Sequence, residues 1–183
     1  MTVVLGPPDQ VPPVPTLVTP RLLLRSWTPA DIPAYTQMAL HPDMSRYTSS
    51  PSDEGAVWRM FAFQIGHWAL RGYGMWIVEE RATGQFLGRA GLYEEHGWPG
   101  LEVAWTIRRD RWGEGFATEG GAAALEYAFT QLSRDRVISI IHPDNVASSR
   151  VAEKLGLAVA QRTEVHGRAR NVWAITRPDR QAS

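Results

Sequence analysis

The chain has 183 residues, with 19 Lys and Arg residues against 19 Asp and Glu residues, and it contains no cysteine. This length corresponds to one domain that is large enough to bury a hydrophobic core. The balanced charge argues against general binding of nucleic acid or of an anionic membrane surface. Without cysteine, disulfides, thiolate metal sites and a cysteine nucleophile are excluded. Since we find neither a signal peptide nor a long apolar run, we expect a cytoplasmic protein without a membrane span.

The N-terminal segment differs in composition from the rest of the chain, because six prolines lie within the first 20 residues. Proline fixes one backbone angle and lacks an N–H donor, so such a segment favours an extended conformation. We therefore expect residues 1–16 to form a flexible arm, residues 17–178 to form a single domain, and residues 179–183 to form a tail.

The hydrophobic pattern predicts both helices and strands. In the segment 53–70, apolar residues recur at helical spacing and indicate one helix face, formed by Trp58, Phe61, Ala62, Ile65 and Ala69. The expected elements in chain order are a strand over 21–27, helices over 29–40 and 53–70, strands over 75–80, 86–93 and 101–107, a helix over 118–132, a strand over 136–141, a helix over 145–155, and strands over 158–165 and 171–176. This order predicts an α+β protein with a mixed central sheet of about seven strands and four flanking helices.

The segment 101–120, LEVAWTIRRDRWGEGFATEG, combines a strand, a loop rich in Arg and Gly, and a helix start. Gly113 and Gly115 allow the loop to turn, and the first turn of the following helix adds free N–H donors. Together these groups are typical of an anion site that binds a pyrophosphate. The glycine spacing matches neither the Walker loop nor the dinucleotide-binding fingerprint. An ordinary strand-to-helix loop is the alternative interpretation.

Three segments, in this order along the chain, resemble the GNAT N-acetyltransferases: TPRLLLR over 19–25, EVAWTIRRDRWGEGFATE over 102–119, and NVASSRVAEKLG over 145–156. The second is similar to the family's acyl-CoA-binding motif. All three look most like the branch that includes the ribosomal-protein N-terminal acetyltransferases. The resemblance implies the GNAT acyl-CoA N-acyltransferase fold and acetyl-CoA as a cosubstrate. The five histidines stand apart in the sequence, so no metal site is expected.

The resemblance also implies which residues bind the cosubstrate. Backbone N–H groups of the loop would bind the CoA pyrophosphate, and the strand edge would pair with the pantetheine amides. The implied residues are Trp105, Thr106, Ile107, Trp112, Gly113, Glu114, Gly115, Phe116, Ala117, Thr118 and Asn145. The side chain of Glu114 is expected to point to solvent, because an acid would repel the pyrophosphate. Asn145 has an alternative role as a helix N-cap, and both roles stay open.

Two residues are the candidates for catalysis. Strand alternation places Glu102 on one face with Ala104 and Thr106, beside the slot that the resemblance implies for the cosubstrate. There Glu102 would accept the proton of the attacking amine, or else form a structural ion pair with an arginine. Ser148 would bind the thioester end or protonate the leaving thiolate, or else satisfy a backbone group in the first helical turn.

The acceptor pocket is expected to contain Tyr47 and Trp98, which lie on predicted loops. Arg168 and Arg170 near the last hairpin would either attract an anionic acceptor or form a solvated charge cluster. The implied reaction is acetyl transfer to a primary amine, of a protein N-terminus or a small molecule, by direct attack in a ternary complex. The alternative is a non-catalytic acyl-CoA-binding sensor or regulatory module with the same fold. The expected partners are acetyl-CoA and the amine, and we expect a monomer or a homodimer.

Overall fold

The computed structural model describes residues 13–47, 51–165 and 167–177. Residues 1–12 of the expected arm and the whole of the expected tail lie outside the described residues. At the end of the arm, the indole Nε1 of Trp76 donates to the carbonyl oxygen of Pro15 at 2.7 Å, and Val14 packs against the core. The last residues of the arm therefore lie against the domain.

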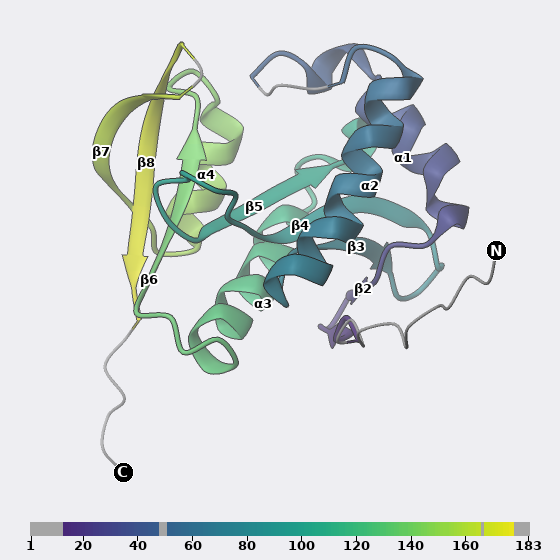
Figure 1. Cartoon of the computed structure of the whole chain (residues 1–183), viewed down its shortest axis with the longest axis horizontal. Helices are drawn as coiled ribbons and strands as arrows, with labels where there is room; N and C mark the ends of the chain where they lie inside the picture. The colour runs from purple at the N-terminus through teal and green to yellow at the C-terminus, as the bar shows by residue number, and fades with distance from the viewer. Residues whose placement is uncertain (1–12, 48–50, 166, 178–183) are drawn as a thin grey trace, which may run out of the picture.

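A mixed sheet of eight strands, in the order β1-β2-β3-β4-β5-β6-β8-β7, forms the centre of the described chain (Figure 1). The strands are β1 (Leu17–Val18), β2 (Leu22–Arg25), β3 (Met75–Glu80), β4 (Phe86–Tyr93), β5 (Glu102–Ile107), β6 (Arg136–Ile141), β7 (Ala158–Val165) and β8 (Arg168–Thr176). Among the described strands, only β5 and β6 pair in parallel. The predicted α+β class is confirmed. The strand in excess of the seven expected is β1, whose two residues are too few to show a periodic pattern.

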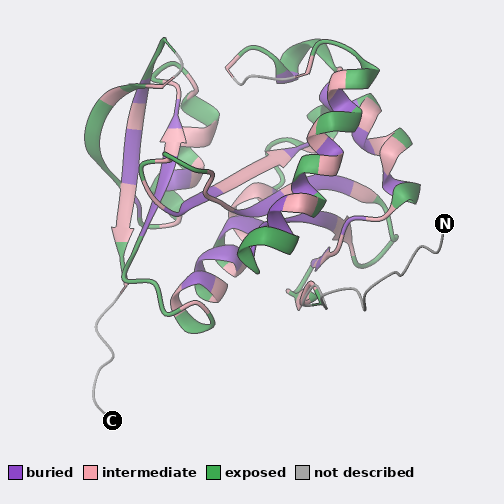
Figure 2. Ribbon diagram, in the orientation of Figure 1, coloured by how far each residue is buried: buried purple, intermediate pink, exposed green. Residues whose placement is uncertain are grey.

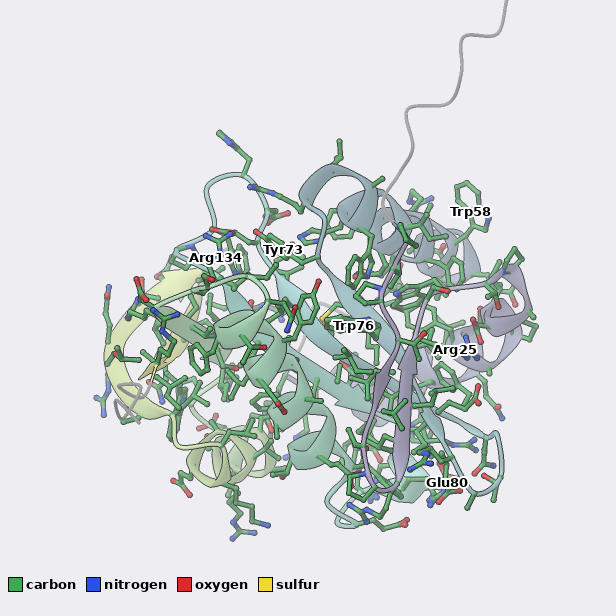
Figure 3. All side chains as sticks on the ribbon, turned by 90° about the horizontal axis from the view of Figure 1, so that it is seen from below. Arg25, Trp58, Tyr73, Trp76, Glu80 and Arg134 are labelled. Carbon is green, nitrogen blue, oxygen red and sulfur yellow. The ribbon has the colours of Figure 1, made fainter. Side chains whose placement is uncertain are left out.

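Four α-helices flank this sheet in the described chain, as the sequence predicts. They are α1 (Ile32–Ala39), α2 (Glu54–Arg71), α3 (Phe116–Thr130) and α4 (Val146–Lys154). Helix α3 packs across β4 and β5. Its Tyr127 meets Trp76 of β3 edge-to-face at 5.2 Å, and Trp76 is labelled in Figure 3. Helices α1 and α2 cover the opposite face of the sheet (Figure 1). Within the described residues, no helix has the length and apolar character needed to cross a membrane.

Helix α2 buries a different face from the one that its apolar spacing indicates, so that prediction is wrong. Trp58 and Ile65 are 60% and 45% exposed. Figure 2 shows both buried and exposed stretches along α2. The buried residues are Val57, Phe61, Gln64, His67 and Trp68. Because two of these five are polar, a pattern built from apolar residues alone selects the wrong face.

Strands β5 and β6 pair only where they begin. A single register pair joins them, Glu102 with Ile138, and the N–H of Ile138 donates to the carbonyl of Leu101 at 2.8 Å. Further along, the two strands diverge (Figure 1), while β5 stays paired with β4 over its whole length. Backbone groups alternate in direction along a strand. The carbonyl of Leu101 points toward β6, so the N–H and C=O groups of Trp105 and Ile107 point to the same side and face the opening between β5 and β6.

Candidate active site

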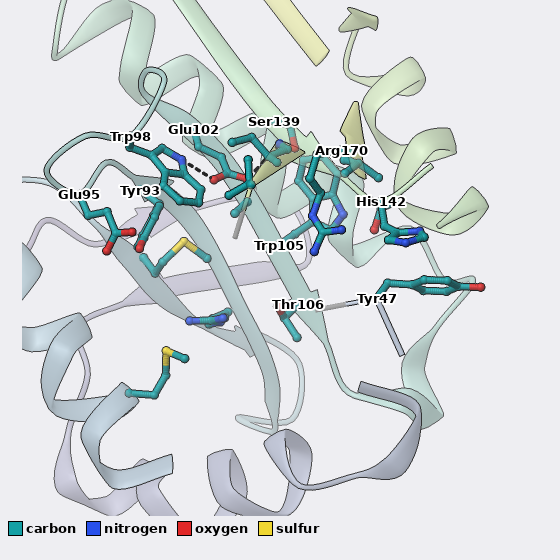
Figure 4. Close-up of a pocket in the computed structure, with 18 of the residues that line it drawn as sticks. Tyr47, Tyr93, Glu95, Trp98, Glu102, Trp105, Thr106, Ser139, His142 and Arg170 are labelled. Atoms are coloured by element: carbon teal, nitrogen blue, oxygen red, sulfur yellow. Dashed lines mark hydrogen bonds between the residues drawn. The ribbon is translucent and has the colours of Figure 1, made fainter. Parts of the chain in front are cut away.

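The opening between β5 and β6 leads into a cavity of about 810 Å³ (Figure 4). Side chains from α2, β4, β5, β6, β8 and the start of α4 line it. Both catalytic candidates, both acceptor-pocket candidates and three of the implied cosubstrate-binding residues lie in this lining: Glu102, Ser148, Tyr47, Trp98, Trp105, Thr106 and Asn145. The remaining implied residues lie at the end of β5, in the loop that follows it and in the first turn of α3.

Glu102 lies at the fork where the two strands separate. It is 7% exposed, one carboxylate oxygen accepts the indole N–H of Trp98 at 2.9 Å, and the other accepts the N–H of Ile140 at 3.0 Å (Figure 4). In a continued parallel ladder, that N–H would bond to the backbone of β5. The carboxylate takes this role instead. No described arginine lies within ion-pairing distance of Glu102, so the alternative of a structural ion pair gains no support.

Burial raises the pKa of Glu102 to about 7. The hydrogen bonds from Ile140 and Trp98, and the more distant charges of Arg89 and Arg170, act in the opposite direction, because each favours the carboxylate. A carboxyl group with a pKa near neutrality exists in both protonation states at pH 7. It can therefore accept and release a proton within a reaction cycle, as a general base must.

The same pKa shift predicts a pH-dependent stability. The folded chain holds the Glu102 proton up to about pH 7, whereas the unfolded chain loses it near the ordinary value of 4.5. Wild-type stability therefore falls as pH rises through this window, by a total of roughly 3 kcal/mol. Glu102→Gln lacks this loss. Between pH 5 and pH 8, the unfolding free energy of the variant should therefore rise relative to that of the wild type. Urea denaturation at both values measures it, and a difference that does not change with pH contradicts the assigned shift.

The start of α4 presents Asn145 and Ser148 to the cavity. The side-chain oxygen of Asn145 accepts the N–H of Ser148 at 3.1 Å, which is the N-cap arrangement that the sequence left as an alternative. The hydroxyl of Ser148 forms no hydrogen bond with the described residues, so it is free to donate to a group in the cavity. A bond between Asn145 and CoA stays a prediction.

The loop between β5 and α3 has the backbone geometry that an anion site needs. Gly113 and Gly115 have φ values of +84° and +86°, in the left-handed region that favours glycine. Gly115 is the N-cap of α3, and no side chain caps the first turn, whose residues Phe116, Ala117 and Thr118 present their N–H groups. The helix begins two residues before its predicted start.

Charged residues surround this loop. The side chain of Glu114 is exposed, as expected, and it also forms a salt bridge with Arg111 at 2.8 Å, which partly neutralises its charge. Arg111 also pairs with Glu80 at 2.8 Å. The side chain of Arg21 donates to the carbonyl of Glu114 at 2.9 Å and forms a salt bridge with Glu119 at 2.6 Å. These contacts hold the loop against the start of β2 and the first turn of α3.

Trp112 contacts the last residue of β5. Its indole N–H donates to the carbonyl of Ile107 at 2.6 Å, and the guanidinium of Arg109 lies 4.7 Å from its ring. One acceptor position on Ile107 is thereby already used within the chain. Trp105 is the residue of the open β5 edge whose backbone groups lie beside the cavity and are not engaged by Trp112.

The acceptor-pocket candidates approach the cavity from two loops. The ring of Tyr47 lies 5.5 Å from that of His142, at the mouth beside β6 (Figure 4). The ring of Trp98 meets Tyr93 edge-to-face at 5.1 Å, near Glu102. Residues 48–50, which follow Tyr47, lie outside the described residues, as does His166 of the last hairpin turn.

Two polar residues of the cavity, Arg89 and Gln64, are missing from the sequence-based site. Arg170, for which the sequence left two roles open, lines the cavity and is buried at 9% exposure, so a solvated charge cluster is the wrong interpretation for it. Arg89 interrupts the apolar run of the predicted strand over 86–93, and a charged residue in such a strand could have indicated a functional role. Gln64 lies three residues after Phe61, and would have stood out only if the buried face of the helix had been assigned correctly.

A family model described as "Acetyltransferase (GNAT) domain" matches residues 21–158. The match spans most of the chain, which therefore belongs to the GNAT acetyltransferase family and is an acetyltransferase.

Individual relatives agree with this. The chain is 31% identical to the uncharacterized protein YkkB of Bacillus subtilis over 144 residues, which cover 77% of this chain and 84% of YkkB. It is similar to the crystal structure of an acetyltransferase from Agrobacterium tumefaciens, with a TM-score of 0.82 and 27% identity over 94% of this chain and 100% of that one. RimL, a ribosomal L7/L12 α-N-protein acetyltransferase in complex with coenzyme A, shares the fold, with a TM-score of 0.74 and 16% identity over 87% of this chain and 96% of that one. The predicted GNAT fold is confirmed, and a ribosomal-protein acetyltransferase shares it.

Proposed function

We propose that this acetyltransferase moves the acetyl group of acetyl-CoA to a primary amine by direct attack in a ternary complex. The observation that carries the proposal is the opening between β5 and β6, with the buried carboxylate of Glu102 at its fork and the open edge of β5 along its side. The coenzyme A in the RimL structure supports acetyl-CoA as the donor.

The proposed cosubstrate path follows the groups described above. The pyrophosphate binds the N–H groups of Gly115 to Thr118 at the start of α3, where the helix dipole favours negative charge. The pantetheine arm enters the opening and pairs with the backbone of Trp105. The N–H of Trp105 also polarises the thioester carbonyl and stabilises negative charge on its oxygen during the reaction.

In the proposed reaction, the neutral amine nitrogen attacks the thioester carbon, a C–N bond forms, and the C–S bond breaks. Glu102 accepts the proton that the amine loses, directly or through one water. The hydroxyl of Ser148 protonates the leaving thiolate and regains a proton from solvent. The products are the acetylated amine and CoA with a free thiol. An amine attacks only when it is neutral. A base whose pKa lies near 7 is therefore needed most for amines of high pKa.

Ligand binding tests the donor assignment. Isothermal titration calorimetry of the full chain should show binding of acetyl-CoA and CoA, and no comparable heat with ATP or NAD, because the loop lacks the spacing that those ligands use. Tight binding of ATP or NAD together with no response to CoA contradicts the proposal.

The acceptor should contact the two aromatic residues at the ends of the cavity. We expect Tyr47→Ala and Trp98→Ala to raise the acceptor KM by about tenfold, with a smaller change in the acetyl-CoA KM, because specificity usually resides in loops on a rigid scaffold. Initial rates with each substrate varied in turn measure both constants. Trp98→Phe, which keeps a ring but loses the N–H to Glu102, serves as the matched variant. The reverse pattern of KM changes would move the acceptor to another part of the chain.

A further inference from the structure

Two arginines of the cavity have no acid within ion-pairing distance among the described residues, although both lie near enough to Glu102 to act on its charge. Arg89 on β4 has a buried Nε atom that forms no hydrogen bond. Arg170 on β8 is 9% exposed, and its guanidinium donates only to the carbonyl of the adjacent Ala169, at 3.0 Å. Each of the other half-buried arginines of the described chain forms a salt bridge with an acid, namely Arg25, Arg108, Arg111 and Arg177. A cation held away from water without a partner is costly, which points to an anion that arrives with a substrate.

Arg89 and Glu102 lie at opposite ends of one strip of the sheet. In the antiparallel pair of β4 and β5, Arg89 lies opposite Thr106, four residues along the strand from Glu102, and residues at alternate positions face the same side. Between these ends lies the register pair of Gly91 and Ala104. Ala104 lines the cavity between the cation and the carboxylate, and its side chain is only a methyl group.

A third polar group faces the same cavity from the opposite wall. Gln64 on α2 lines the cavity and is 1% exposed, and its Oε1 has no hydrogen-bond partner among the described residues. Its Nε2 lies 3.8 Å from the sulfur of Met60, which is a weak acceptor. Buried amide groups in proteins are normally satisfied, so an unpartnered one beside a cavity suits a ligand that donates an N–H.

We propose, building on the function proposed above, that the acceptor is a small compound with both an amine and a carboxylate, as in a free amino acid. Its carboxylate binds the guanidinium of Arg89, and Arg170 supplies the second positive charge. Gln64 accepts one N–H of the amine, and Glu102 accepts the proton that the amine loses. A peptide N-terminus lacks a carboxylate near its amine, unless its first side chain is acidic, and would leave both arginines without a partner.

Matched acceptors test this assignment on the full chain. We would measure kcat and KM at saturating acetyl-CoA for L-amino acids, for their amides, for the amines obtained by removing the carboxylate, and for peptides that begin with a neutral or an acidic residue. The amino acids should exceed their amides at least about tenfold in kcat/KM, because a charge-assisted bond to Arg89 forms only with the carboxylate.

Arg89→Gln should lower kcat/KM for amino acids by about 10- to 100-fold, mainly through KM, and should leave the amides within about threefold. Arg59→Gln is the control, because it removes the same charge from an exposed position at the edge of the cavity and should leave the ratio of acid to amide unchanged. If Arg89→Gln does not fold, Arg170→Gln provides the same comparison, with a smaller expected effect.

The proposal would be overturned if the wild type acetylated amides or neutral peptides with the same kcat/KM as amino acids. Equal losses of kcat/KM for acids and amides in both arginine variants would also overturn it. A preference for acidic peptides alone would also overturn it in favour of a protein substrate. These outcomes leave the proposed acetyl transfer to amines intact. That function fails separately, if no amine of any kind is acetylated and acetyl-CoA does not bind.

Discussion

Glu102→Gln should lower kcat for amine acetylation by ~10²–10⁴ at pH 7, the range that general acid–base catalysis contributes. Glutamine nearly keeps the shape of the side chain and can still accept one of the two hydrogen bonds from Ile140 and Trp98, but it cannot take up a proton. The affinity for CoA should change little, because the pyrophosphate loop lies beyond the other end of β5.

The pH dependence separates a base from a merely structural residue. Since burial raises the pKa of Glu102 to about 7, the wild-type rate should rise with pH through that value as the carboxylate forms. The variant should lack this rise, and its deficit should shrink at higher pH, where more of the acceptor amine is neutral without help. Glu95→Gln removes a second acid from the same cavity and is the matched control. Full turnover of Glu102→Gln at pH 7, or equal losses in both variants, would assign Glu102 to structure.

Gly115→Val should weaken binding of CoA by roughly 10- to 100-fold, which corresponds to the loss of one or two well-placed hydrogen bonds to a charged group. Gly115 has φ at +86°, and a Cβ atom there would lie 3.3 Å from the guanidinium of Arg21. A β-branched side chain is strained at this φ and occupies the space through which a pyrophosphate approaches the N-terminus of α3.

A matched variant controls for the strain itself. Gly72 caps the end of α2 with φ at +72°, and a Cβ there meets no atom within 4 Å. Gly72→Val therefore introduces similar backbone strain far from the loop, and it should bind CoA as the wild type does. Titration calorimetry, with thermal unfolding as the check on folding, measures both variants. An unchanged dissociation constant in folded Gly115→Val would refute the role of the loop.

Most of the fold could be predicted because its elements carry local signals. The four helices and seven of the strands have periodic patterns, caps or turns that do not depend on tertiary contacts. The face of α2 was predicted wrongly because Gln64 and His67 lie on the buried side. There His67 accepts the N–H of Glu94 at 3.2 Å, and its other ring nitrogen lies 2.9 Å from the carbonyl oxygen of Tyr73. Such compensation for burial is visible only in three dimensions.

The candidate site divides in the same way. The residues in continuous motifs, such as Glu102, Gly115 and Asn145, could be identified from sequence because the family pattern fixes their spacing. Arg89 and Arg170 belong to strands that the sheet brings to one cavity, and no spacing along the chain relates them. Whether an arginine is solvated or buried depends on what covers it, which is why the interpretation of Arg170 had to be corrected.

The release of CoA thiol from acetyl-CoA at pH 7, followed with and without a panel of primary amines, tests the central claim most directly. The proposed transfer predicts release that depends on the amine, with one acetylated amine found by mass spectrometry for each thiol released. It also predicts that Glu102→Gln loses most of this activity while it still binds CoA. Thiol release at the same rate with and without every amine, in a folded protein that binds acetyl-CoA, would contradict direct transfer to an amine in this cavity.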